Sequence, residues 1–227
     1  MKISEIFVSI QGESTTAGLP TVFVRTFGCN LRCPYCDSRY AWEGHDYIEM
    51  TAEQVFGKIT EYLPVKQVCL TGGEPFVQIK EIAILMQYLN EQGYNVSIET
   101  NGTLFMRDDG RYNHIFASAK LVPDVKGPTS DVQYTEKMLE KYLNLLPQDE
   151  VKFVVGDMRD LEFAEKVMNK YIPRELFERR HVLVSPIWSV EGKAWMKVVA
   201  SWVIQRPTLR MQIQMHKVIW GASKRGV

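Results

Sequence analysis

The chain has 227 residues, 45% of them hydrophobic, and its 27 basic side chains balance 27 acidic ones, so the formal net charge is zero. This length and composition predict a single domain over residues 1–227 with a sizeable core. Zero net charge argues against a nucleic-acid-binding surface, which usually carries a basic excess, and no apolar run approaches the 18 residues of a membrane span. Because the opening residues do not read as an export signal, we expect a cytoplasmic protein with reduced cysteines.

Strands and helices are predicted to alternate along the chain. Runs of β-branched and aromatic residues predict the strands, and apolar residues spaced three and four apart predict the helices. In chain order the predicted elements are strand 21–27, helix 51–63, strand 65–70, helix 79–91, strands 95–99 and 114–118, helix 135–146, strand 151–155, helix 159–171, strand 181–184, helix 190–205 and strand 209–214. Thr51 and Gln54 form a capping box at the start of the first helix.

This alternation predicts the α/β fold class, with helices packed on a parallel sheet. Six or seven strands are fewer than the eight of a closed barrel, so we expect a partial, open β/α barrel of about six parallel strands. The active face of such a sheet lies at the carboxyl ends of its strands. Most of the unusual polar or glycine-rich segments follow predicted strands, which indicates one site on that face.

The most informative of these segments is a loop with three cysteines, Cys29, Cys33 and Cys36, spaced C-x3-C-x2-C. It supplies three thiolates, one fewer than a closed four-ligand site needs, and an iron–sulfur cluster held in this way keeps one iron open. Zinc is the alternative, with His45 as a fourth ligand. Zinc knuckles usually bring two separated pairs of ligands, however, and the chain has no second pair. Cys69 lies in an apolar run, where we expect a buried core residue.

Two further segments follow strands. Gly72 and Gly73 would let the backbone approach a ligand closely, and Glu74 adds a carboxylate beside them, although the same residues also suit a plain tight turn. Glu99 ends the next strand and could bind ribose hydroxyls, whereas the residues after it could form only a bend.

Other polar residues extend the candidate site. Ser118 and Lys120 offer a hydroxyl and a cation, although a solvated surface lysine is the commoner use. Gln11 and Glu13 together could read a guanine-like edge, because the amide donates and accepts while the carboxylate accepts. Arg25 lies inside a strand and needs a partner, which could be a substrate carboxylate or a nearby acid of the protein.

The cysteine loop resembles that of the radical S-adenosylmethionine enzymes, whose open iron binds the amino and carboxylate groups of S-adenosylmethionine. Over residues 5–217 the chain resembles one family of that type more closely, the 7-carboxy-7-deazaguanine synthases. The motifs that carry this resemblance are Ile-Gln-Gly-Glu near the start, Arg25, Cys-Asp-Ser after the third cysteine, Thr-Gly-Gly-Glu-Pro and a late His-Lys pair.

The resemblance implies conversion of 6-carboxy-5,6,7,8-tetrahydropterin into 7-carboxy-7-deazaguanine, with loss of ammonia, for queuosine and related deazapurines. A 4Fe–4S cluster on the three cysteines and S-adenosylmethionine would start the reaction, and Mg²⁺ would bind at Ser38. The implied S-adenosylmethionine contacts are Gly72, Gly73, Glu74, Glu99, Ser118, Ala119 and Lys120. The implied pterin contacts are Ile10, Gln11, Gly12, Glu13, Arg25, Thr71 and His216.

The same resemblance implies a substrate-binding N-terminal extension over residues 1–20, a homodimer, and a flavodoxin or ferredoxin as electron donor. One departure is Ala119, which stands where members of the family often have proline, so this loop is less rigid. Two alternatives remain at this point: an activase that makes a glycyl radical on a partner protein, and a non-catalytic metal-binding domain.

Overall fold

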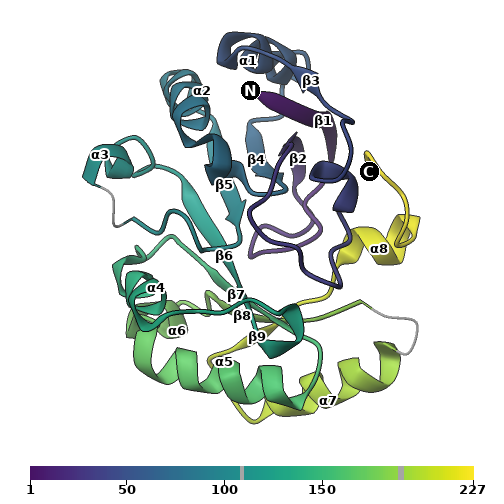
Figure 1. The fold of residues 1–227 in the computed structure, drawn as a ribbon, viewed down its shortest axis with the longest axis vertical. Coiled ribbons are helices and arrows are strands. Elements are labelled where there is room, and N and C mark those ends of the chain that lie inside the picture. The colour runs from purple at the N-terminus through teal and green to yellow at the C-terminus, as the bar shows by residue number, and fades with distance from the viewer. Residues whose placement is uncertain (108–109, 189–191) are drawn as a thin grey trace.

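In the computed structural model, which describes residues 1–107, 110–188 and 192–227, helices cover one side of a single open sheet (Figure 1). The strand order across the described part is β3-β1-β2-β4-β5-β6-β7-β8-β9. The strands are β1 Lys2–Ile10, β2 Pro20–Thr26, β3 Ile48–Glu49, β4 Gln67–Gly72, β5 Asn95–Thr100, β6 Lys120–Lys126, β7 Val151–Val155, β8 Val182–Pro186 and β9 Arg210–Met211. The helices are α1 Ala52–Thr60, α2 Ile79–Glu91, α3 Gly110–Asn113, α4 Glu136–Glu140, α5 Met158–Tyr171, α6 Arg174–Glu178, α7 Gly192–Ile204 and α8 Met215–Trp220.

The predicted open β/α sheet is confirmed. Strands β2 and β4 to β9 run parallel, each paired with its neighbour. Two strands at this end of the sheet were not predicted: β1, which pairs antiparallel with β2, and the short edge strand β3, which pairs antiparallel with β1. Residues 1–20, predicted as an extension, therefore begin as a strand of the sheet itself.

Local sequence signals explain several helices. Thr51 caps α1 as predicted: its Oγ1 accepts from the Gln54 N–H at 3.1 Å, and Gln54 Oε1 accepts from the Thr51 N–H at 2.8 Å. Helix α2 has the predicted bounds and buries its apolar stripe. The predicted helix 135–146 is instead the short α4 followed by a 3₁₀ turn over Lys141–Asn144. The start of the predicted helix 190–205 lies outside the described residues, and α7 confirms the rest.

The predicted strand 114–118 is wrong. These residues form a turn after α3, and Arg107 donates to the carbonyl oxygens of Phe116 (3.0 Å) and Ala119 (2.8 Å), so these two carbonyls are not in a strand ladder. The strand of this region is β6, which contains Pro123, although a proline cannot donate to the ladder of a sheet. Pro123 lies where β6 changes its pairing from β5 to β7, and the sheet accommodates it there.

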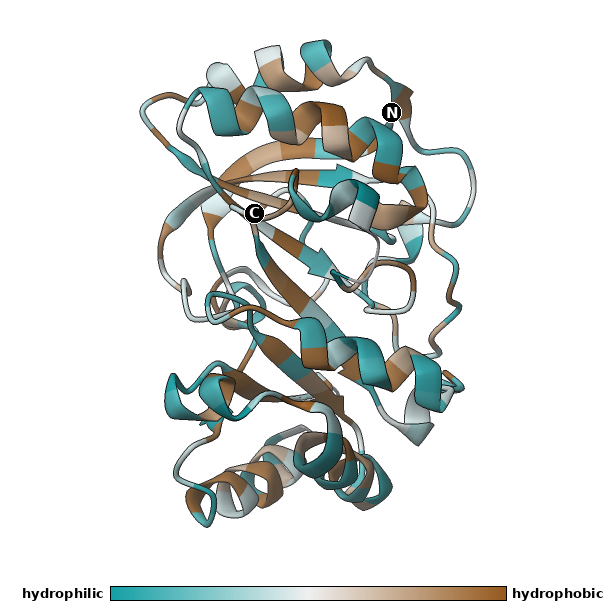
Figure 2. Cartoon of the chain, turned by 90° about the vertical axis from the view of Figure 1, so that its left-hand side faces the viewer, coloured by the Kyte–Doolittle hydropathy of each residue, from teal (hydrophilic) through white to brown (hydrophobic). Residues whose placement is uncertain are grey.

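Alternate residues of each strand pack against the helices. Val24, Leu70 and Ile98 belong to one buried cluster with α1 and α2, and Phe153 and Val184 belong to a second cluster with α5 and α7. Figure 2 shows hydrophobic stretches on the strands and on the helix faces that meet them. Cys69 is fully buried, as predicted. The helix-covered side of the sheet is therefore the side that stabilises the fold.

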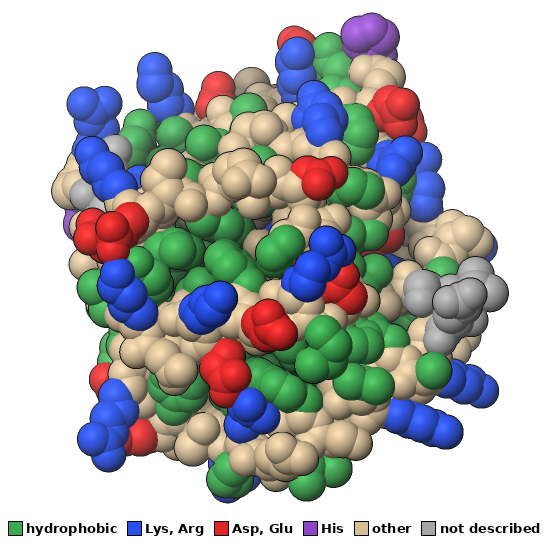
Figure 3. All heavy atoms as spheres, turned by 60° about the horizontal axis from the view of Figure 1, so that its bottom comes forward, with side chains coloured by type: hydrophobic (Ala, Val, Ile, Leu, Met, Phe, Trp, Pro, Cys, Tyr) green, Lys and Arg blue, Asp and Glu red, His purple; other side chains and the backbone are tan. Residues whose placement is uncertain are grey.

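Two surface features agree with the composition. Among the described residues, no helix is both long and apolar enough to cross a membrane. On the face formed by the lower helices, basic and acidic side chains are intermixed (Figure 3). The described residues of that face form no patch of a single sign that would attract nucleic acid.

Candidate active site

The side of the strands opposite the helices carries polar residues around one cavity of about 510 Å³. Five neighbouring strands contribute polar residues to its lining, among them Arg25 from β2, Thr71 from β4, Glu99 from β5, Asp124 from β6 and Lys152 from β7. Each alternates with an apolar residue that faces the helices, because successive side chains of a strand point to opposite faces. We call these five residues the polar row.

The cysteine loop follows β2 and brings Cys29, Cys33 and Cys36 to the same cavity. Burial and the neighbouring cysteines raise the pKa values of the Cys29 and Cys33 thiols. The Leu31 N–H points at Cys29 Sγ at 3.4 Å, so the loop offers this sulfur a hydrogen-bond donor. Three thiols in one cavity, with an N–H group directed at a sulfur, are a donor set that suits an iron–sulfur cluster.

A zinc site is not favoured by this arrangement. In the described part of the chain, no three His, Cys, Asp or Glu side chains are placed to hold a single metal ion. His45, which would be the fourth zinc ligand, is exposed and does not line the cavity.

The paired glycines hold β4 against the cysteine loop. A Cβ atom on Gly72, whose φ is +146°, would overlap the backbone of Thr26, and one on Gly73 would overlap the carbonyl of Gly28. The Gly73 N–H donates to the Thr26 carbonyl oxygen at 3.1 Å, and the Glu74 N–H donates to that of Gly28 at 2.8 Å. Glycine is therefore required at both positions by close backbone approach.

Glu74 lies behind the cavity rather than in its lining. Its side chain is fully buried and accepts hydrogen bonds from Phe76 N–H (3.1 Å), Thr100 Oγ1 (2.8 Å) and Asn101 N–H (2.6 Å). Burial raises the pKa of Glu74 to about 7, although these donors oppose the shift. Its visible role is to tie the loop after β4 to the loop after β5, so a contact with S-adenosylmethionine stays a prediction.

Arg25 has the internal partner that its burial requires. Its Nε donates to Glu5 Oε1 at 2.7 Å across the β1–β2 pair, and Tyr40 Oη donates to the same oxygen at 2.8 Å. Arg25 and Glu5 both line the cavity. Glu5 is thus the nearby acid of the protein that was one of the two predicted partners of Arg25. It lines the cavity in which the other predicted partner, a substrate carboxylate, would bind.

Gln11, Thr71 and Glu99 meet in the cavity. Glu99 accepts a hydrogen bond from Thr71 Oγ1 at 3.1 Å and from Gln11 Nε2 at 3.5 Å. Burial raises the pKa of Glu99, and Lys152 opposes that shift. Ile10 lines the cavity next to Gln11.

Glu13 and Asp124 share one buried cation. Lys152 Nζ forms an ion pair with Glu13 and lies 3.0 Å from Asp124 Oδ1. Gln214 Nε2 donates to Glu13 Oε1 at 2.8 Å, and Gln212 Nε2 donates to Glu13 Oε2 at 3.1 Å. Burial alone would raise the pKa of Glu13, but Lys152 and these donors outweigh it and lower the pKa. Glu13 is therefore held charged and in a fixed orientation.

Ser38 lies at the mouth of the cavity beside Asp37. Its Oγ donates to Asp37 Oδ1 at 3.0 Å, and Lys217 forms an ion pair with the same carboxylate. Burial would raise the pKa of Asp37, but the Lys217 cation and the Ser38 donor lower it well below its usual range. Two neighbouring oxygen donors, one of them a carboxylate, suit a hard cation such as Mg²⁺.

Gly12 and His216 come together from opposite ends of the chain. A Cβ atom on Gly12 would overlap His216 Nδ1, and the Met215 N–H donates to the Gly12 carbonyl oxygen at 3.0 Å. Burial lowers the pKa of His216. Helix α8 is thus seated on the loop after β1, and both predicted residues line the cavity.

The predicted segment Ser118-Ala119-Lys120 does not line the cavity. It leads into β6, whose first residue is Lys120, instead of following a strand, so it lies at the opposite end of the sheet. Exposed Ser118 donates to Asn90 Oδ1 at 2.7 Å, and Ala119 is a core residue. Lys120 Nζ lies 2.5 Å from Glu150 Oε1 and 2.9 Å from Ser14 Oγ. The cause of the misplacement is the strand that was wrongly predicted at 114–118.

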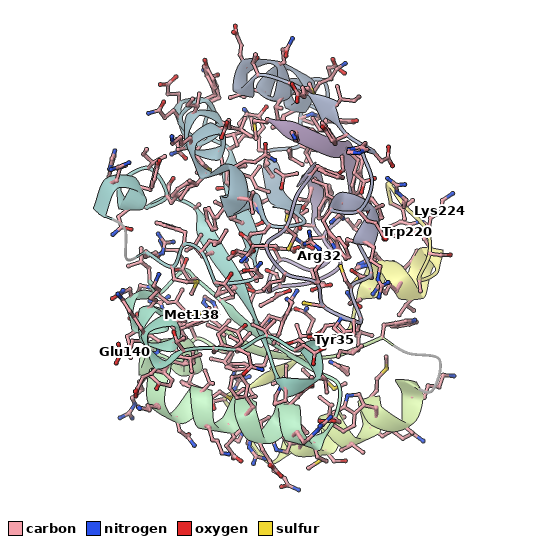
Figure 4. All side chains as sticks on the ribbon, in the orientation of Figure 1. Arg32, Tyr35, Met138, Glu140, Trp220 and Lys224 are labelled. Carbon is pink, nitrogen blue, oxygen red and sulfur yellow. The ribbon has the colours of Figure 1, made fainter. Side chains whose placement is uncertain are left out.

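Several cavity residues were not predicted: Tyr35, Asn101, Asp124, Lys126 and Lys152. Asp124, Lys126 and Lys152 carry the signal that singled out Arg25, a charged residue inside an apolar strand. Tyr35 lies between two cluster cysteines in sequence, and Figure 4 shows it with Arg32 near the middle of the molecule, between the upper and lower groups of helices.

Comparison with known proteins agrees with this geometry. Residues 23–119, which hold the cysteine loop and the first three parallel strands, match the model of the radical SAM superfamily. The chain is 32% identical to the 7-carboxy-7-deazaguanine synthase of Koribacter versatilis, with both chains covered completely. It is 37% identical to that of Methanospirillum hungatei, over 96% of this chain and 85% of the relative.

A solved structure shares the fold. The crystal structure of QueE from Escherichia coli superposes with a TM-score of 0.73 at 22% identity, covering 95% of this chain and 94% of that one. The Koribacter versatilis relative covers the whole length of the chain, including the N-terminal strand and α8. This chain belongs to the 7-carboxy-7-deazaguanine synthase family of radical S-adenosylmethionine enzymes.

Proposed function

We propose that this enzyme converts 6-carboxy-5,6,7,8-tetrahydropterin into 7-carboxy-7-deazaguanine, with loss of ammonia, for queuosine and other deazapurines. The observation that supports the proposal best is that the polar row and the three cysteines line one cavity. A cavity of about 510 Å³ suits a small substrate beside a cofactor. The relatives carry the name of this synthase, which does not favour the glycyl-radical activase.

As a radical S-adenosylmethionine enzyme, the protein uses a 4Fe–4S cluster and S-adenosylmethionine, which when bound supply the radical that starts the ring contraction. Cys29, Cys33 and Cys36 would hold the cluster. Gly73 and Glu99 line the cavity close to the cysteine loop and would contact S-adenosylmethionine. Glycine at position 73 keeps the backbone next to Gly28 free of a side chain that would fill this space.

Other polar residues of the cavity would position the pterin. Arg25 would bind the substrate carboxylate, because its guanidinium lies at the cavity and its link to Glu5 uses Nε. Gln11 and Glu13 would read the guanine-like edge, with Glu13 kept charged by Lys152. Thr71 and His216, which also line the cavity, would complete the contacts.

Ser38 would hold Mg²⁺ together with the substrate carboxylate, with Asp37 beside it. The electron would come from a flavodoxin or ferredoxin. A homodimer and a cytoplasmic location remain predictions from the sequence.

An anaerobic assay tests the proposed function. Protein with a reconstituted cluster would be incubated with S-adenosylmethionine, dithionite, Mg²⁺ and 6-carboxytetrahydropterin, and the products would be measured by mass spectrometry. We expect 7-carboxy-7-deazaguanine, and no product from Cys33→Ala. 5′-Deoxyadenosine without the deazaguanine would contradict the substrate while leaving the radical chemistry in place.

A further inference from the structure

A tryptophan outside the predicted site is directed at a cluster cysteine. Trp42 directly follows the 3₁₀ turn Arg39–Ala41, and its indole Nε1–H donates to Cys36 Sγ at 3.3 Å. The side chain is half-buried and lines the cavity. Hydrogen bonds to the sulfurs are one of the means by which a protein tunes an iron–sulfur cluster.

Arg32 holds this tryptophan in place. Its guanidinium carbon lies 4.5 Å from the centre of the Trp42 ring, and its Nη1 donates to the carbonyl oxygens of Cys29 (2.8 Å) and Leu31 (2.7 Å). The two bonds fix the cation to the cysteine loop, so the cation–π contact also fixes the indole. A cation over the ring withdraws electron density from it, which strengthens the N–H as a donor.

We propose that Trp42, positioned by Arg32, raises the reduction potential of the 4Fe–4S cluster; this inference rests on the proposed function because it requires the bound cluster. Reduction moves one electron from an external low-potential donor to the cluster, whose sulfurs become more negative. The N–H···S hydrogen bond is therefore stronger in the reduced state, and that state is stabilised relative to the oxidised one. The consequence is a cluster that its donor can reduce more readily.

The chain contains a matched control pair at the C-terminal end of α7, with Trp202 in the helix and Arg206 just after it. Arg206 lies 3.8 Å from the centre of the Trp202 ring, and its Nη1 donates to the Trp202 carbonyl oxygen at 3.1 Å. Trp202 packs against the buried cluster that contains Phe153 and Val184, and neither residue of the pair lines the cavity. The pair reproduces the stacking of arginine on tryptophan without a cysteine partner.

Potentiometric titration of the reconstituted holoenzyme, followed by EPR of the reduced cluster, tests the proposal. In Trp42→Phe we expect a lower midpoint: the ratio of reduced to oxidised cluster at a fixed potential falls about threefold to tenfold, the worth of one hydrogen bond. This is about 30 to 60 mV at 59 mV per tenfold for a one-electron couple. Trp202→Phe should keep the wild-type midpoint. Equal midpoints in wild type and Trp42→Phe at equal iron content would overturn the proposal.

A second measurement does not depend on that variant. Pulsed EPR of the reduced cluster, in protein with ¹⁵N-indole tryptophan and a Trp188→Phe background, should show a coupling to one indole nitrogen. The background is needed because Trp188 also lines the cavity. Absence of this coupling overturns the proposal even where Trp42→Phe binds no cluster.

The outcomes separate this inference from the proposed function. A lowered midpoint in Trp42→Phe, with wild type that makes no deazaguanine, supports the role of Trp42 and contradicts the substrate. Deazaguanine production with unchanged midpoints contradicts the role of Trp42 alone. Wild-type protein that binds no 4Fe–4S cluster overturns both.

Discussion

The two faces of strands β2 and β4 to β7 differ sharply, although the same five strands build both. On the helix-covered face, apolar side chains such as Leu70 and Phe153 are closed off from solvent. On the other face, Arg25, Asp124 and Lys152 place charges around the cavity. The comparison teaches that alternate residues of each strand have different roles: one set stabilises the fold and the other lines the cavity. Neighbouring substitutions should therefore have different consequences, and the following predictions use this difference.

The largest effect is expected from Leu70→Ala. Leu70 is fully buried in the cluster that the strands form with α1 and α2. The substitution removes apolar contacts and leaves a cavity, which lowers the unfolding free energy by about 2 to 5 kcal/mol. Urea denaturation would measure the loss, and turnover per folded molecule should be unchanged. Leu143→Ala, at a 54% exposed position, is the control and should stay within about 0.5 kcal/mol of wild type. Loss of turnover in folded Leu70→Ala would break the separation of the two faces.

Glu74 should make stability fall as the pH rises. Its pKa is about 7 in the folded protein, against an ordinary value of 4.5, so the folded state holds a proton that the unfolded chain has lost between these values. The contribution of Glu74 to the unfolding free energy is then greatest below pH 4.5 and declines toward pH 7, by about 3 kcal/mol at most.

Denaturation of wild type and Glu74→Gln across this window would measure the effect, because the amide cannot ionise. We expect the difference between the two proteins to change with pH in the stated direction. Parallel stability curves for the two proteins would show that Glu74 ionises as an ordinary carboxyl does.

Arg25→Gln should affect activity more than stability. Loss of a charge-assisted hydrogen bond to substrate is worth about 1.5 to 3 kcal/mol, which lowers kcat/KM about 10- to 100-fold. Steady-state kinetics with the pterin as varied substrate would measure it. The matched control is Arg206→Gln, which removes a surface pair with Glu165 and should leave kcat/KM unchanged. An Arg25→Gln enzyme with wild-type kinetics would mean that Arg25 only pairs with Glu5 and does not bind the substrate.

Ser118→Ala should have the smallest effect. The hydroxyl is exposed and donates to Asn90 outside the cavity, so we expect less than about 0.5 kcal/mol in stability and unchanged kinetics. Isothermal titration with S-adenosylmethionine sharpens the comparison, with Gly73→Ala as the variant that should weaken binding. Weakened S-adenosylmethionine binding in Ser118→Ala would restore the contact that the sequence predicted.

The fold was predictable where local pattern and tertiary environment agree. Helix α2 has the expected bounds because its apolar stripe faces the core, and the Thr51 capping box forms as expected. Strand β1 escaped prediction because it lies near one edge of the sheet and mixes polar with apolar residues. Strand β6 was not predicted, and it contains Pro123, which lies at the point where β6 stops pairing with β5 and begins pairing with β7.

The site was predictable where its residues lie close together in sequence, as in the cysteine loop and the glycine pair. Lys152 was not predicted because its place in the site depends on its ion pair with Glu13, which lies 139 residues away in the sequence. The partner that makes a buried charge tolerable is supplied by tertiary structure. A charged residue within an apolar strand was nevertheless a usable signal, and it was applied only to Arg25.

The polar row also determines which changes in chain length this enzyme can accept. Inserting or deleting one residue within β2, β4, β5, β6 or β7 exchanges the two faces of the strand beyond that point. In β7, for example, the apolar partner Phe153 would enter the cavity and Lys152 would turn toward the helices. Insertions and deletions in this protein should therefore be confined to the loops that lead from helices into strands, at the end of the sheet away from the cysteine loop. The five strands should keep their lengths.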